Sequence, residues 1–147
     1  MRNVARRAAV APATAYTYFA SKDHLVAEAF WRKLAALDEV APASGTVADR
    51  VVAAIEDIAR LVSGEPALAA AATPALFADE PDVARLRRQV GALFHARFAA
   101  ALGEGADEAV VLTLDLAFSG ALVRAGVGEL AYADLVGLMR TVAGALG

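Results

Sequence analysis

Apolar residues recur at intervals of three and four along almost the whole chain, and no stretch alternates apolar and polar residues for long. This spacing gathers apolar side chains on one face of a helix, so it predicts an all-α fold. Prolines, glycines and capping residues divide the pattern. We expect helices at about 2–8, 12–18, 22–40, 46–63, 79–102, 106–127 and 131–146, with a short helix that opens at Pro66 and is interrupted at Pro74.

Local signals mark where several of these helices begin. Ser21 and Thr46 are good N-caps, because a hydroxyl oxygen can accept a hydrogen bond from a free backbone N–H of the first turn. Pro12, Pro66 and Pro81 stand near predicted helix starts, where a missing N–H costs nothing. With 147 residues, the chain is long enough for one compact domain, or for a large domain with a small helical appendage.

Composition removes several classes of function. The chain has no cysteine, only two histidines, no glycine-rich phosphate loop and no nucleophile motif, so we expect neither an enzyme nor a cofactor or metal site. No apolar run reaches the roughly 18 residues that span a bilayer, and no secretory signal is visible. We therefore expect a cytoplasmic protein without a membrane partner.

Charge is distributed unevenly along the chain. Residues 1–22 carry four cations and no acid, whereas the rest carries a net charge of −7, and the total is −3. Two short helices separated by a three-residue turn in this basic segment predict a helix-turn-helix, whose second helix can lie in a DNA major groove. A small cluster of cations is also common on an ordinary solvated surface, so charge alone does not establish DNA binding.

The order of residues in this segment resembles the DNA-binding signature of the TetR family of bacterial transcriptional regulators. The matching residues are Val4, Ala5, Ala8, Val10, Thr14, Tyr16, Tyr18, Phe19, Ser21, Lys22 and Leu25. The resemblance implies an all-α protein with a partial helix-turn-helix region at 1–24 and a ligand-binding and dimerisation domain at 25–147. It also implies a double-stranded DNA operator, bound through Arg2, Ala13, Thr14, Tyr16, Thr17, Tyr18 and Lys22.

Within that set, the resemblance gives the residues different roles. Tyr16 and Lys22 resemble phosphate-contacting residues, whereas Arg2, Ala13, Thr14 and Thr17 resemble base-contacting ones. Phosphate contacts position the protein, and base contacts specify the sequence. Tyr18 can contact DNA, or it can pack within the helix-turn-helix region at 1–24, which we call the head.

The segment also departs from the family pattern. Ala9 stands at the usual turn glycine and Ala11 at the usual cap of the recognition helix, which loses about 1 kcal/mol of helix stabilisation. By this resemblance the sequence begins inside the second helix of the family fold, so we expect the helix that covers the apolar side of the other two to be missing; either the true start lies upstream or this is a truncated form. We expect the 147-residue form to bind an operator poorly unless that helix is supplied. A dimerisation or ligand-sequestering module without operator binding is the alternative.

Aromatic and aliphatic residues of the predicted bundle can line an apolar pocket, the usual place for a small ligand between helices. We expect a small apolar or lipid-like effector there, although each of these residues can equally be plain core. The predicted lining is Phe30, Trp31, Phe77, Leu86, Val90, Phe94, Phe98 and Asp115. Asp115 lies in an apolar run, where a carboxylate needs a partner, so it either faces the pocket or pairs with an arginine across a dimer.

The last two predicted helices mix large apolar residues with glycine and alanine, which lets helices approach closely. We expect them to form a two-fold homodimer. The predicted interface is Leu114, Phe118, Leu122, Leu138 and Val142. With the resemblance to the TetR family, these features imply a homodimeric, ligand-responsive repressor.

Overall fold

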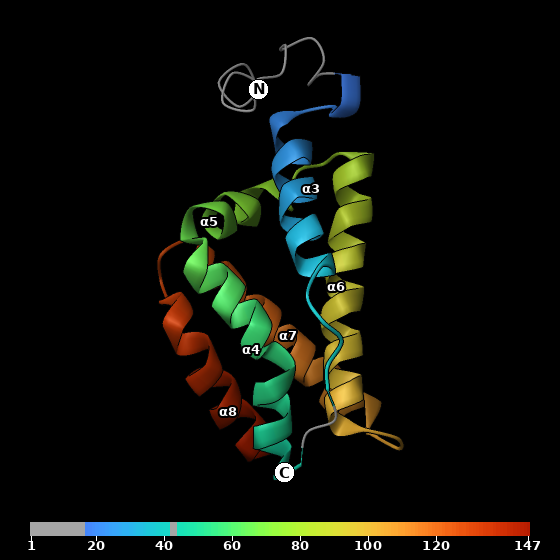
Figure 1. Cartoon of the computed structure of the whole chain (residues 1–147), viewed down its shortest axis with the longest axis vertical. Helices are drawn as coiled ribbons and strands as arrows, with labels where there is room; N and C mark the ends of the chain where they lie inside the picture. The colour runs from blue at the N-terminus through green and yellow to red at the C-terminus, as the bar shows by residue number, and fades with distance from the viewer. Residues whose placement is uncertain (1–16, 42–43) are drawn as a thin grey trace.

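The computed structural model describes residues 17–41 and 44–147, which contain six α-helices, one 3-10 helix and no strand. The all-α prediction is therefore confirmed. The described helices are α3 (Lys22–Ala35), α4 (Val47–Gly64), α5 (Pro66–Ala75), α6 (Pro81–Leu102), α7 (Glu108–Gly126), η1 (Tyr132–Asp134) and α8 (Leu135–Leu146) (Figure 1). The helices predicted at 2–8 and 12–18 lie outside the described residues, apart from Thr17 and Tyr18.

The helix predicted at 22–40 is shorter than expected, because α3 ends at Ala35. Arg32 and Lys33 occupy its last turn, where positive charge complements the helix dipole. Asp38 and Glu39 follow, and their negative charges would oppose the dipole if the helix continued. The boundary predicted between residues 24 and 25 falls within α3, so the two predicted domains would share this helix.

The start of α4 is fixed by a reciprocal cap. The Thr46 hydroxyl accepts a hydrogen bond from the Asp49 backbone N–H at 3.2 Å, and the Asp49 carboxylate accepts one from the Thr46 N–H at 3.1 Å. Arg140 of α8 donates a hydrogen bond to the same carboxylate at 2.7 Å. The Arg140 and Thr46 hydrogen bonds lower the pKa of Asp49 from 3.8 to about 2. The cap thus also connects α4 to α8.

The helices form one bundle around a common core. In Figure 1, α3 runs beside α6, and α4 lies beside α8. α7 contacts α5, α6 and α8. The fully buried ring of Phe118 on α7 meets Phe94 and Phe98 of α6 edge to face, with centroid distances of 5.1 and 5.8 Å. Such pairs add about 0.5–1.5 kcal/mol beyond the burial of area, so this cluster fixes α7 against α6.

A close approach joins α5 to α7 beside this core. A Cβ placed on Gly126 would lie only 2.7 Å from the Cβ of Thr73 and would also collide with the Thr73 hydroxyl. The absence of a side chain at Gly126 therefore sets how near the two helices can lie.

α7 lies within the helix predicted at 106–127 and has a high mean hydropathy. In the described part of the chain it is the one helix that reaches membrane-spanning length and composition, with 19 residues and a mean hydropathy of 1.5. The expectation that no segment would reach this threshold was wrong, because the average stays high across Thr113, Asp115 and Ser119. One face of the helix packs against α5, α6 and α8, and a helix of a packed bundle can meet the same criterion.

Candidate functional site

An apolar cavity of about 230 Å³ lies among α3, α4, α5, α6, α7 and η1. Phe30 of α3 and Phe94 of α6 supply aromatic walls, and both are buried. Phe77, which follows α5, and Arg87 of α6 also line the cavity, and both are exposed. The cavity therefore reaches the surface beside Phe77 and Arg87.

Small side chains create the space. α5 presents Ala69 and Ala72 to the cavity, and α6 presents Gly91, where an added Cβ would meet no atom within 4 Å. Large side chains at these positions would fill the volume between Phe30 and Phe94. The cavity is thus a consequence of an alanine-rich α5 opposite a glycine on α6.

Four of the eight predicted pocket residues line the cavity, namely Phe30, Phe77, Val90 and Phe94. Leu86 and Phe98 do not line it, and both side chains are fully buried in the core. Trp31 packs, partly buried, against the same core. The other lining residues were not predicted from the sequence, because their contribution depends on how the helices pack: Val62, Ala69, Ala72, Thr73, Leu76, Arg87, Gly91, Ser119, Leu122, Val123 and Tyr132.

Asp115 lies outside the cavity and pairs within its own protomer. Its carboxylate accepts a hydrogen bond from the Ser119 hydroxyl at 3.4 Å and lies 4.0 Å from Nδ1 of His95 on α6. Glu108 approaches the other ring nitrogen of His95 at 3.5 Å. Burial raises the pKa of Asp115 above 3.8, against the opposing effects of Ser119 and His95.

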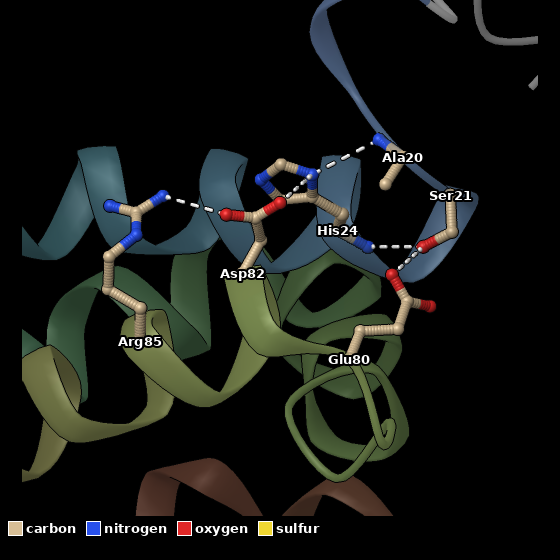
Figure 2. Close-up of polar contacts among 6 residues, drawn as sticks. All are labelled: Ala20, Ser21, His24, Glu80, Asp82 and Arg85. Carbon is tan, nitrogen blue, oxygen red and sulfur yellow. Dashed lines mark hydrogen bonds and ion pairs between the residues drawn. The ribbon is translucent and has the colours of Figure 1, made fainter.

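A polar joint connects the start of α3 to the start of α6 (Figure 2). The Ser21 hydroxyl accepts a hydrogen bond from the His24 backbone N–H at 3.0 Å and donates one to the Glu80 carboxylate at 2.8 Å. Nδ1 of His24 accepts a hydrogen bond from the Ala20 backbone N–H at 3.2 Å and lies 4.0 Å from Asp82. These contacts fix the point where the chain enters the bundle.

The opposite end of α3 is held by a buried cation. The Arg97 side chain of α6 donates hydrogen bonds to the backbone carbonyls of Asp38 and Ala54, at 2.6 and 2.9 Å. Arg97 is only 6% exposed, so these carbonyls satisfy a guanidinium that water cannot solvate. The segment after α3 is thereby attached to both α4 and α6.

Three of the predicted DNA-contacting residues are described, and all three are exposed: Thr17, Tyr18 and Lys22. Tyr18 is 72% exposed, and the alternative that it packs within the head involves residues outside the described ones. Arg2, Ala13, Thr14 and Tyr16 lie outside the described residues.

The predicted dimer-interface residues separate into two groups. Leu114 and Phe118 are completely buried within the protomer, so their assignment to an interface was wrong. Leu122 lines the cavity, Val142 is partly buried and Leu138 is 39% exposed. On α7 the exposed large apolar side chains are instead those of Leu112, Leu116 and Val123, at 49%, 65% and 36%.

Comparison with known proteins identifies the N-terminal motif. Residues 1–29 match the sequence profile described as "Bacterial regulatory proteins, tetR family". A strand-free helical bundle that follows such a motif defines a helical transcriptional regulator rather than an enzyme.

Similar proteins specify the family. An uncharacterized HTH-type transcriptional regulator of Mycobacterium bovis is 40% identical over 146 residues, which are 98% of this chain and 68% of that protein. The HTH-type transcriptional repressor KstR of Mycolicibacterium smegmatis is 36% identical over 109 residues, 71% of this chain and 53% of that protein. The chain belongs to the TetR family of transcriptional regulators.

A solved structure supports the same fold. A TetR transcriptional regulator from Rhodococcus sp. RHA1 superimposes with a TM-score of 0.65 at 23% identity, over 97% of this chain and 81% of that one.

Proposed function

We propose that this regulator is a homodimeric repressor that binds operator DNA and is released by a small apolar or lipid-like effector in the cavity. One observation carries this proposal: the same helix, α3, lines the cavity and begins within the DNA-binding signature. Its buried Phe30 lines the cavity, while its first residue, the exposed Lys22, belongs to the DNA-binding signature. A ligand that moves α3 therefore moves the attachment point of the head.

The two ends of α3 are held differently, which gives such a movement a direction. The segment beyond its C-terminal end is fastened by the buried guanidinium of Arg97. Its N-terminal end is held by the partly buried hydrogen bond from Ser21 to Glu80 and by His24. A ligand pressing on Phe30, between these ends, would move the less firmly held N-terminal end most.

Operator release follows from this geometry in a dimer. Two recognition helices must enter successive major grooves roughly 34 Å apart. A ligand that prefers one angle of α3 shifts the population toward heads that miss this spacing. The name of the Mycolicibacterium smegmatis relative, a repressor, supports this sign of regulation. Binding to bacterial operator DNA would require a cytoplasmic protein.

The dimer would form through the outer surfaces of α7 and α8. Leu112 and Leu116 of α7 and Leu138 of α8 are exposed apolar side chains on these helices. Gly120 and Gly137 are exposed beside them, and an added Cβ at either would meet no atom within 4 Å. An apolar, self-complementary surface of this kind closes as a two-fold pair.

The operator proposal is tested by selecting duplexes from a random-sequence library at fixed salt. The selection uses the 147-residue chain and a form with the first helix of a TetR-family head joined before residue 1. Lys22→Ala should weaken binding to all sequences, because a phosphate contact is sequence-independent, and Thr14→Ala should chiefly relax base preference. Lys33→Ala, on the same helix but paired with Glu65 at 2.6 Å, is the matched control and should leave binding unchanged.

Two results would contradict parts of this proposal. Absence of sequence-selective binding by the helix-supplemented form at any salt would overturn the repressor function and leave a ligand-sequestering module. Tight, selective binding by the 147-residue chain itself would show that the first helix is unnecessary for the head.

A further inference from the structure

The cavity has one formal charge in its wall. Among the described residues that line it, Arg87 alone is charged, and no carboxylate accompanies it. Arg87 donates one hydrogen bond, from Nη1 to the backbone carbonyl of Leu76 at 2.7 Å, which holds the guanidinium at the cavity mouth. It forms no ion pair within the described part of the chain, whereas Arg85 on the same helix lies 3.8 Å from Asp82. Arg87 therefore has donors left for a ligand.

The interior of the cavity offers little to a polar group. The Thr73 hydroxyl donates to the Ala69 carbonyl at 3.2 Å, and the Ser119 hydroxyl donates to Asp115 at 3.4 Å. The Tyr132 hydroxyl is covered by neighbouring atoms and has no hydrogen-bond partner among the described residues. The remaining wall is hydrocarbon, which favours an apolar ligand body.

We propose that the effector is an anionic amphiphile: a hydrocarbon body of about nine carbons inside the cavity and a carboxylate at Arg87. This inference rests on the proposed effector cavity and adds its ligand chemistry. An engineered apolar cavity of about 150 Å³ holds benzene. A volume of about 230 Å³ thus takes roughly one and a half times as many carbons. The guanidinium fork matches a carboxylate, and hydrogen bonds between such charged partners are stronger than neutral ones.

The test compares two probes that differ only in their head group, decanoate and decan-1-ol, both below their aggregation concentrations. Their affinities for the 147-residue chain are measured by isothermal titration calorimetry. The chain should bind decanoate about five- to tenfold more tightly than decanol, because only the carboxylate gains a charge-assisted hydrogen bond. Raising the salt concentration should reduce this preference, because Arg87 lies at the exposed mouth.

Arg87→Gln should abolish the preference for decanoate and leave the affinity for decanol unchanged. Arg88→Gln is the matched control: Arg88 is also exposed but does not line the cavity, so the preference should persist. Equal affinities for both probes, or equal effects of the two substitutions, would overturn the anionic effector while leaving the cavity as a ligand site. Binding of neither probe would overturn this inference and the proposed effector cavity together.

Discussion

Ser21 Oγ donates a hydrogen bond to Glu80 Oε2 at 2.8 Å, across 59 positions of sequence. The same oxygen accepts the His24 backbone N–H and caps α3. One side chain therefore both starts the helix that leaves the DNA-binding segment and attaches that start to the residue preceding α6. We interpret this pair as the contact that an effector must strain to move the head.

Ser21→Ala should lower the free energy of unfolding by about 1 kcal/mol, because it removes the N-cap of α3 together with the Glu80 contact. Chemical denaturation followed by circular dichroism measures this change. Ser63→Ala, at an exposed position of α4, is the control and should stay within about 0.5 kcal/mol of the original chain. Equal stabilities of the two variants would show that the Ser21 contacts contribute nothing.

Gly126→Ala should lower the free energy of unfolding by about 1–3 kcal/mol, because the new methyl group would collide with Thr73 and separate α5 from α7. Gly64→Ala, in the last turn of α4 and away from the proposed dimer surface, is in open space, so its better helix propensity should make it neutral or stabilising by up to about 1 kcal/mol. Thermal denaturation of both variants is the measurement. If Gly126→Ala left the thermal stability unchanged, α5 and α7 would not be packed this closely.

Asp115→Asn should raise the free energy of unfolding at pH 7. Burial raises the pKa of Asp115 in the folded state above 3.8, so folding penalises the charged carboxylate. The folded state holds this proton more tightly than the unfolded chain, so the benefit of the substitution should shrink as the pH falls toward 3.8. Denaturation series between pH 3.5 and 7 measure this difference in the free energy of unfolding. Glu104→Gln, at an exposed position, is the charge-matched control. If the stabilisation by Asp115→Asn did not change with pH, burial of the charged carboxylate would be excluded as its cause.

Leu116→Lys should convert the proposed dimer into monomers, because it places a charge on the apolar surface of α7. The side chain is 65% exposed in the protomer, so the fold itself should be unaffected. Light scattering should give about twice 15.1 kDa for the original chain and 15.1 kDa for the variant. Ala53→Lys, on the exposed face of α4, should remain dimeric. A monomer mass for the original chain would contradict the proposed dimer.

The sequence alone predicted the helix class and most helix positions, because caps such as Thr46 and breakers such as Pro66 act locally. It did not resolve which apolar residues face the cavity. Phe94 and Phe98 stand four residues apart on α6, yet the first lines the cavity and the second is sealed against Phe118. That difference depends on the size of the side chains on neighbouring helices.

The same limit applied to the proposed interface. α7 is apolar around much of its circumference, so periodicity does not distinguish the face that packs in the core from the face left outside. Leu114 and Leu116 differ by two positions and point to opposite environments, one fully buried and one 65% exposed. Tertiary packing was needed to tell them apart.

The central claim is that the ligand in the cavity controls DNA binding through α3. Its most direct test is fluorescence anisotropy of a selected operator duplex titrated with the helix-supplemented chain, with and without saturating decanoate. Decanoate should weaken operator binding more than tenfold. It should have no such effect on Gly91→Leu, whose side chain occupies the cavity. Unchanged operator affinity, while calorimetry shows decanoate bound in the original cavity, would contradict the account.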